Sequence, residues 1–215
     1  MQYSLFIDFD GTIAVQDVGN RFFTTFSGGR SIPIVEKWIR REITSVECLE
    51  AEAELITAAE DELVEFSKQF EIDSGFELLH ALCAKNDIPI RVVSDGLDIY
   101  INAIMKKHGF EHVPVMANRG VFRNGRLKID FPHLDGSCGH CANCKGAAIR
   151  KHARAGGKSI FVGDGYSDLC AIDEADYLFA KADLATYLNQ SNKSFLSFET
   201  LYDVRDYIEN RILKN

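Results

Sequence analysis

Two aspartates, Asp8 and Asp10, stand one residue apart at the end of a short apolar run, with Gly11 and Thr12 directly behind them. Acidic residues are depleted in strands, and carboxylates spaced i, i+2 on a straight strand share one face. Two anions that close raise the pKa of one of them strongly unless a cation lies nearby. The stretch FIDFDGTI (6–13) therefore indicates a site in which two carboxylates work beside a cation.

Three more polar segments follow apolar runs or open a helix: VSDG (93–96), the loop that enters a helix at Lys145, and GDGYSD (163–168). In open α/β sheets, sites lie outside the carboxyl ends of the strands, so we expect these segments to gather at one edge. GDGYSD adds two carboxylates, and Mg²⁺ typically takes carboxylate oxygens together with phosphate and water. The acidic set Asp8, Asp10, Asp164 and Asp168 therefore predicts a Mg²⁺ site.

The same segments carry groups that suit a phosphate. Thr12 and Ser94 offer hydroxyl donors, and Gly11 and Gly96 let backbone amides approach closely. Lys145 adds a positive charge at a helix start. One carboxylate can then attack phosphorus, while the second protonates the leaving oxygen and later activates water.

The elements that must position these residues alternate along the chain. Apolar runs predict strands over 3–9, 89–94, 159–163, 176–180 and 194–198, with helices over 75–86, 97–109, 145–157 and 199–213 and an Asn-Gly hairpin over 121–129. This alternation is typical of a doubly wound α/β fold with a mainly parallel sheet. Residues 15 to about 73 break it with helical periodicity alone, including the capping-box sequence TSVE (44–47), and predict a helical insert.

Taken together in this order, DFDGT, a Ser after an apolar strand, a Lys opening a helix and GDGxxD resemble the haloacid dehalogenase superfamily of aspartate-nucleophile phosphohydrolases. The resemblance implies a Rossmann-like α/β core over 1–14 and 74–215. The helical insert over 15–73 is similar to that superfamily's C1-type cap, as in subfamily IB.

Site roles follow from the resemblance. Asp8 would be the nucleophile and Asp10 the general acid and base. Mg²⁺ would be held by the Asp8 carboxylate, the Asp10 carbonyl and Asp164, with Asp168 supporting the metal's waters or Lys145. The phosphate-binding set would be Gly11, Thr12, Ser94, Asp95, Gly96 and Lys145.

Within the superfamily, the GDGYSDLCAIDEADYLFAKADL stretch is similar to methionine-salvage phosphatases that act on a methylthio-ketopentenyl phosphate. SDGLDIYI and the CxxCxxCK run also resemble phosphoethanolamine and phosphocholine phosphatases. Phosphoserine phosphatases share this branch and carry a substrate-contacting Glu where this chain has Asp17, one methylene shorter; Asp17 alternatively caps the following helix. The substrate within the class of small phosphorylated metabolites stays open.

Three cysteines, Cys138, Cys141 and Cys144, have C-x₂-C-x₂-C spacing close to His133 and His140. Tetrahedral zinc needs four nitrogen or sulfur ligands, so a second metal site holding Zn²⁺ is one interpretation. A thiol-rich active-site loop and a disulfide are the alternatives.

The composition and net charge of the chain limit the classes of molecule that it is expected to bind. The chain has 215 residues, 46% of them hydrophobic and 26% charged, and a formal net charge of −8, which argues against nucleic acid or an anionic membrane as a partner. No basic, apolar leader opens the chain, so we expect a cytoplasmic enzyme, as a monomer or homodimer. Phosphotransfer to an alcohol by the same aspartyl-phosphate chemistry and a catalytically silent binding module are the alternative functions.

Overall fold

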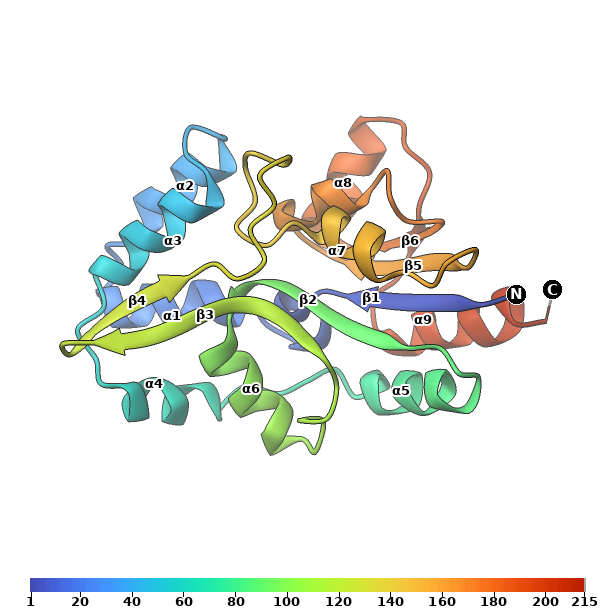
Figure 1. Ribbon diagram of the computed structural model, residues 1–215, viewed down its shortest axis with the longest axis horizontal. Helices are drawn as coiled ribbons and strands as arrows, with labels where there is room; N and C mark the ends of the chain where they lie inside the picture. Colours follow the sequence, from blue (N-terminus) through green and yellow to red (C-terminus); the bar gives the residue numbers. More distant parts are fainter. Residues whose placement is uncertain (215) are drawn as a thin grey trace. The chain divides into compact units, whose positions relative to one another are not determined.

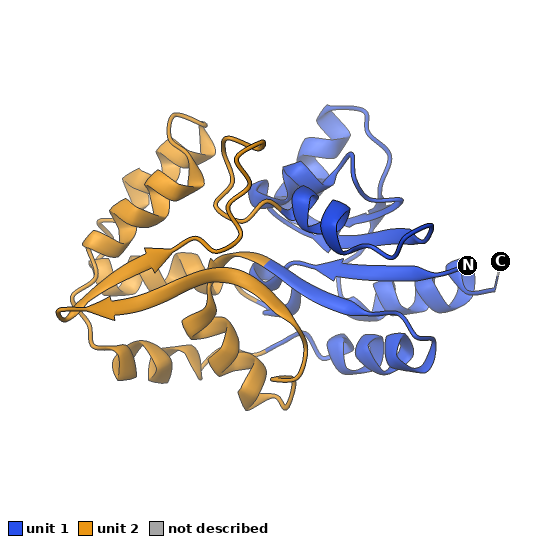
Figure 2. Ribbon diagram, in the orientation of Figure 1, with its two compact units in different colours: residues 1–15, 72–93, 145–215 blue, residues 16–71, 94–144 orange. Residues whose placement is uncertain are grey.

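The computed structural model describes residues 1–214, which divide into two compact units (Figures 1 and 2). Unit 1 comprises residues 1–15, 72–93 and 145–215, and unit 2 comprises residues 16–71 and 94–144. This grouping joins residues 94–144 to the helical insert. The functional division expected from the sequence, a core of 1–14 with 74–215 and a cap of 15–73, stays a prediction.

Unit 1 is built on a parallel sheet. Its strands are β1 (Tyr3–Ile7), the first part of β2 (Ile90–Leu97), β5 (Lys158–Gly163), β6 (Tyr177–Ala180) and β7 (Leu196–Ser197). Their order is β2-β1-β5-β6-β7, and every neighbouring pair is parallel. Leu5 on the central strand pairs with Ile90 on one side and Ile160 on the other. All five residues of β1 are buried, as expected for a strand covered on both faces. The predicted α/β class with a mainly parallel sheet is confirmed.

Helices cover both faces of this sheet. They are α5 (Gly75–Lys85), α7 (Lys145–His152), α8 (Ala182–Gln190) and α9 (Leu201–Tyr207). Figure 1 shows α5 and α9 on one side of the strands of unit 1 and α7 and α8 on the other. The helix predicted over 199–213 is α9 together with a π-helical turn over Ile208–Ile212. Two other helices differ more from the sequence prediction. Helix α7 ends five residues early, ahead of a turn in which Gly156 has φ +69°, and α8 was not predicted because it buries only Leu184 and Leu188.

Unit 2 contains the predicted helical insert, with α1 (Val18–Ser27), α2 (Ile32–Ile39), α3 (Ser45–Glu54) and α4 (Glu60–Ser67). Thr44 forms the expected capping box with Glu47: its hydroxyl accepts from the Glu47 amide, and its own amide donates to the Glu47 carboxylate. Aromatic rings join α1 to α4, with centroids 5.1 Å apart between Phe26 and Phe66. Phe22 is fully buried, so ring packing holds the insert together.

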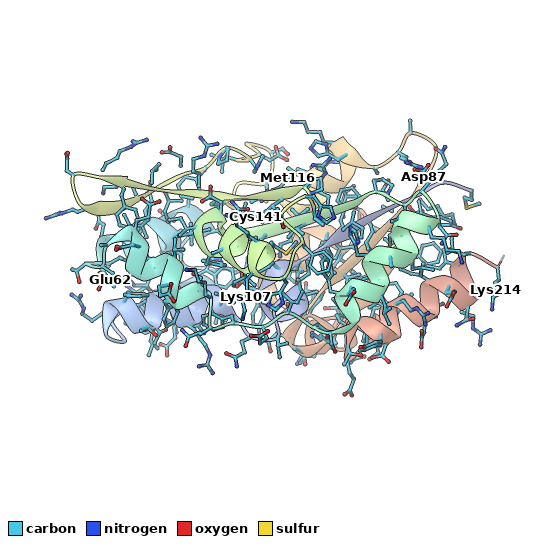
Figure 3. The ribbon with its side chains drawn as sticks, turned by 90° about the horizontal axis from the view of Figure 1, so that it is seen from below. Glu62, Asp87, Lys107, Met116, Cys141 and Lys214 are labelled. Carbon is cyan, nitrogen blue, oxygen red and sulfur yellow. The ribbon has the colours of Figure 1, made fainter. Side chains whose placement is uncertain are left out.

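The remainder of unit 2 consists of α6 (Asp98–Lys107) and a hairpin of β3 (Val115–Arg123) and β4 (Arg126–Asp130). The hairpin turns at Asn124 and Gly125, which have φ values of +53° and +72°, as the Asn-Gly pair predicts. At the end of α6, Lys107 (labelled in Figure 3) donates to the Phe70 carbonyl at 3.2 Å and pairs with Glu71. No helix within residues 1–214 combines the length and the apolar character that crossing a membrane requires.

Candidate active site

Asp8 follows the last residue of β1, at the carboxyl end of the central strand of unit 1. Its amide donates to the Val162 carbonyl at 2.9 Å, and the residue is 3% exposed. The chain then turns sharply, with Gly11 at φ +72° and the Ala14 amide donating to the Phe9 carbonyl at 2.8 Å. This turn, rather than a straight strand, brings Asp10 close enough to Asp8 for the two carboxylates to interact.

Lys145 is the first residue of α7, and its side chain is fully buried. Its Nζ lies 2.8 Å from Oδ1 of Asp8 and forms a second ion pair with Asp168. The ammonium also donates to the Ser167 hydroxyl at 2.9 Å. Lys145 therefore joins the end of β1 to the GDGYSD segment, as a single buried cation between two carboxylates.

Asp168 has both carboxylate oxygens engaged. Oδ1 accepts from Lys145, and Oδ2 accepts from the amides of Asp164 and Gly165 at 2.8 and 2.9 Å. A Cβ at Gly163 would collide with this carboxylate, so glycine is required there. Asp168 is fully buried, and these bonds fold its loop so that Asp164 comes to the same edge.

Asp164 directly follows β5, the strand next to β1 in the sheet. The Thr12 hydroxyl donates to its Oδ1 at 2.9 Å. A Cβ on Gly11 would collide with the same carboxylate, so the glycine of DFDGT is needed for close approach as well as for its positive φ.

Burial and like charge set the electrostatics of these groups. Burial, followed by repulsion from Asp168, raises the pKa of Asp8 well above its usual range, although Lys145 opposes the shift. Burial and Asp168 likewise raise the pKa of Asp164 to about 7, with the Thr12 hydrogen bond and Lys145 opposing. Burial lowers the pKa of Lys145, but attraction from Asp168 and Asp8 outweighs it and leaves that pKa above its ordinary value.

The arrangement suits a hard divalent cation. Oxygens of Asp8, Asp164 and Asp168 all lie within 4.8 Å of one another, and the Asp164 carboxylate can lie against Gly11 because residue 11 has no side chain. Three carboxylates share one lysine, so a further positive charge would relieve the repulsion that raises the pKa values of Asp8 and Asp164. Oxygen ligands of this kind are those that Mg²⁺ takes.

The VSDG segment continues β2 from unit 1 into unit 2. Val92 pairs with Ile7, and Ser94 follows two residues later. Ser94 is buried, and its hydroxyl accepts from the Gly96 amide at 3.0 Å. This hydrogen bond fixes the Ser94 hydroxyl. It also restricts the backbone of Asp95, which lies between the two bonded residues.

Two buried asparagines hold this segment, and sequence reasoning missed both. The Asn118 amide group donates to the Asp95 carbonyl at 2.7 Å. The Asn143 side chain donates to the carbonyls of Ser94 and Met116 at 2.9 and 2.8 Å, and its backbone amide donates to Asp95 Oδ1 at 2.7 Å. The role of Asn143 could not be predicted from the sequence, because its hydrogen-bond partners are backbone carbonyls of strands far away along the chain.

Asp17 caps α1: its Oδ1 accepts from the Asn20 amide at 2.8 Å. This is the helix-cap interpretation of that residue, and substrate contact by Asp17 stays a prediction. Nearby in unit 2, Glu52 of α3 is 4% exposed and interacts electrostatically with Asp17.

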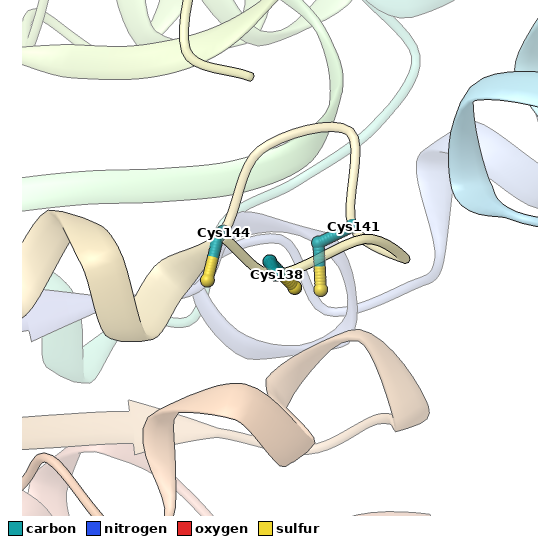
Figure 4. Close-up of side chains that lie close together, drawn as sticks. All are labelled: Cys138, Cys141 and Cys144. Carbon is teal, nitrogen blue, oxygen red and sulfur yellow. The ribbon is translucent and has the colours of Figure 1, made fainter. Parts of the chain in front are cut away.

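The three cysteines of the CxxCxxC run come together in unit 2. Their sulfurs lie within 4.8 Å of one another, and Figure 4 shows them gathered on one side of the loop. A zinc ion at this cluster stays a prediction.

Comparison with known proteins assigns the family. The model of the haloacid dehalogenase-like hydrolases matches residues 5–173. Two curated relatives, the 2-hydroxy-3-keto-5-methylthiopentenyl-1-phosphate phosphatases of Bacillus cereus (strain AH820) and Bacillus anthracis, are each 28% identical over 214 residues, covering 98% of this chain and 97% of theirs.

Solved structures with the same fold include two phosphoserine phosphatases. The enzyme of T. onnurineus in complex with NDSB-201 is 20% identical with a TM-score of 0.72, covering 98% of this chain and 96% of its own. A substrate-bound phosphoserine phosphatase is 19% identical with a TM-score of 0.74, covering 97% and 98%. At this identity the likeness establishes the fold alone. Since the family model spans most of the length, including both acidic segments, the chain belongs to the haloacid dehalogenase-like hydrolases.

Proposed function

We propose that this protein hydrolyses a small phosphomonoester through a phospho-aspartate intermediate on Asp8. The protein is a phosphatase of its family. The observation that carries the mechanism is the buried contact of 2.8 Å between Lys145 Nζ and Asp8 Oδ1, which fixes a carboxylate at the end of the central strand. A carboxylate held in one orientation is prepared for in-line attack.

In the first step, a carboxylate oxygen of Asp8 forms a bond to phosphorus while the bond from phosphorus to the substrate oxygen breaks. Asp10 gives its proton to that leaving oxygen. In the second step, Asp10 takes a proton from water as the water oxygen bonds to phosphorus. The bond between phosphorus and Asp8 then breaks, which releases inorganic phosphate and restores the aspartate.

Mg²⁺ would be held by the carboxylates of Asp8 and Asp164 and the backbone carbonyl of Asp10. Bound there, it would neutralise the negative charge that accumulates around the phosphoryl group. We assign Asp168 to positioning rather than direct coordination, because Lys145 and two amides already occupy both of its oxygens.

The phosphate would be bound by hydroxyls, amides and the ammonium of Lys145. Thr12 lies beside Asp164 in unit 1 and keeps its hydroxyl oxygen at this edge. Ser94 and the amides of Asp95 and Gly96 are assigned from the family resemblance, and the buried, ordered turn at Ser94 supports that assignment.

A methylthio-ketopentenyl phosphate is our leading substrate candidate. The curated phosphatases that carry this name align with 98% of the chain. Asp17 is one methylene shorter than the Glu that contacts substrate in phosphoserine phosphatases, which makes phosphoserine the less favoured candidate.

Phosphate release from a panel of phosphomonoesters tests this proposal. The panel contains the methylthio-ketopentenyl phosphate, phosphoserine, phosphoethanolamine and phosphocholine, each with Mg²⁺ and with chelator. We expect metal-dependent turnover with the highest kcat/KM for the first compound and none in Asp8→Asn. Turnover that survives Asp8→Asn would overturn the nucleophile, and a preference for phosphoserine would overturn the substrate.

Added alcohol separates hydrolysis from phosphotransfer. A hydrolase releases inorganic phosphate as its main product, whereas a phosphotransferase forms a new phosphoester with the alcohol. No turnover on any compound, with Mg²⁺ bound, would favour the silent binding module. The cytoplasmic location, the monomeric or homodimeric state and the absence of nucleic-acid and membrane partners stay predictions.

A further inference from the structure

The thiol loop between β4 and α7 brings together three side chains that the proposed reaction does not use. Cys138, Cys141 and Cys144 each place a sulfur within 4.8 Å of the other two. Figure 4 shows the three side chains directed to the same side of the loop. Cys144 is 4% exposed, while Cys138 and Cys141 are half-buried.

Backbone hydrogen bonds shape this loop at its beginning. The Asp135 carboxylate accepts from the Ser137 amide at 3.0 Å, and the Asp135 carbonyl accepts from the Cys138 amide at 3.1 Å. Gly139, with φ +65°, then reverses the chain between the first two cysteines. The first half of the loop is thus built by turns and not by an apolar core.

The end of the loop is anchored just as firmly. The Ser45 amide donates to the His140 carbonyl at 2.9 Å, and the buried Asn143 side chain donates to carbonyls of β2 and β3. Thiols are weak hydrogen-bonding groups, and two of the three remain partly exposed. The turns and the backbone anchors therefore hold three sulfurs together, two of them partly exposed, in an arrangement that a shared ligand could use.

We propose that Cys138, Cys141 and Cys144 bind one zinc ion as three thiolates, and that the ion fixes the loop preceding α7. Zinc–sulfur bonds are about 2.3 Å long, which places tetrahedral sulfurs about 3.8 Å apart. The observed sulfurs lie within 4.8 Å of one another, a limit about 1 Å above that spacing. Soft thiolates select zinc over Mg²⁺, so this site is chemically distinct from the carboxylate cluster.

Cys144 directly precedes Lys145, the first residue of α7, so the cluster lies at the end of the loop that enters this helix. Among the described residues, no His, Asp, Glu or further Cys joins the three sulfurs in the group. A water molecule would complete four-coordination.

The site has a consequence for the enzyme, because the segment it fixes leads straight into Lys145. A bound ion would restrict the backbone at Cys144 and so steady the start of α7. We therefore expect zinc removal to reduce activity severalfold without abolishing it, since Asp8 and the other groups of unit 1 remain. The metal proposal itself does not depend on the reaction and is tested without it.

Metal content of the folded, reduced protein is the first measurement. The protein is equilibrated with zinc in excess Mg²⁺, which saturates the carboxylates, and bound zinc is counted after dialysis. We expect about one zinc per chain in the wild type and at least a 100-fold lower affinity in Cys138→Ser and Cys141→Ser. Cys83→Ala, which changes a buried thiol of α5, is the matched control and should retain the metal.

Cobalt substitution reports the ligands directly. Co²⁺ in this site should show thiolate-to-metal charge-transfer absorption that falls in each serine variant and is unchanged in Cys83→Ala. Two results would overturn the proposal: a reduced, folded protein that takes up neither zinc nor cobalt, or a wild-type mass lower by two hydrogens that shows two of the cysteines joined as a disulfide. Thermal unfolding of each variant confirms that the loss of metal does not reflect loss of fold.

Discussion

Nζ of Lys145 lies 2.8 Å from Oδ1 of Asp8, and both side chains are withdrawn from solvent. The same ammonium pairs with Asp168, so one lysine balances two buried carboxylates. Attraction from those carboxylates keeps the pKa of Lys145 above its ordinary value, which favours its charged form. This agrees with the proposal that Asp10, and not Lys145, transfers the proton.

Replacing Lys145 by Met should damage both stability and activity. Removing one partner of a buried ion pair leaves an uncompensated charge, and we expect the free energy of unfolding to fall by about 3–5 kcal/mol. The loss of a preorganised cation at the phosphate should lower kcat/KM by roughly 100- to 1,000-fold. Denaturant unfolding and steady-state kinetics measure the two effects.

The matched control is Lys193→Met, which removes the same charge from an exposed ion pair with Asp173. Surface pairs contribute little, so this variant should keep its activity and lose no more than about 1 kcal/mol. Equal effects in the two lysine variants would contradict the structural role assigned to Lys145.

Unlike Lys145→Met, Asp8→Asn should abolish most of the activity without lowering the stability of the protein. Turnover should fall at least about 10⁴-fold, because the amide cannot attack phosphorus. The free energy of unfolding at neutral pH should not decrease, since burial and repulsion from Asp168 already penalise the Asp8 carboxylate. An Asn variant as unstable as Lys145→Met would show that Asp8 is needed for the fold, contrary to this expectation.

Sequence patterns predict the parallel sheet well, because each strand is an apolar run bounded by glycine or polar residues, as in β1 and β5. They fail at α8, whose two buried leucines form too sparse a stripe to mark a helix. The acidic motifs are visible in the sequence because the chemistry fixes their residue types. Asn118 and Asn143 are invisible there, because their role depends on carbonyls that only the folded chain brings within reach.

Gly11→Ala should weaken Mg²⁺ binding at least about tenfold. Its Cβ would collide with the Asp164 carboxylate, and the backbone has φ +72°. Displacing a carboxylate of the proposed metal site should weaken the affinity for the ion, as the loss of groups that orient metal ligands does. The dependence of activity on Mg²⁺ concentration measures the change.

Gly28→Ala controls for backbone strain alone. Gly28 has a similar φ of +62°, and nothing lies within 4 Å of a Cβ placed there. This variant should lose about 1 kcal/mol of stability and keep its Mg²⁺ dependence. If both alanine variants shift the Mg²⁺ dependence equally, contact between Gly11 and Asp164 is not the cause.

Glu52→Gln should remove a pH dependence of stability. Burial is the main cause that raises the pKa of Glu52 from 4.5 to about 8. The hydrogen bond from the Cys48 thiol lowers this pKa, and the nearby charge of Asp17 raises it further. Its Oε1 has no hydrogen-bond partner among residues 1–214. The folded protein therefore binds a proton that the unfolded chain releases above about pH 4.5, so the free energy of unfolding falls as pH rises through this window.

The expected slope from this one group is up to about 1.4 kcal/mol per pH unit between pH 4.5 and 8. Glu52→Gln, which stays neutral, should flatten the dependence and be more stable than the wild type near pH 8. Glu54→Gln, on the exposed side of the same helix α3, should leave the slope unchanged. Urea unfolding at several pH values measures it, and parallel curves for the wild type and Glu52→Gln would show that Glu52 is already ionised in the folded protein.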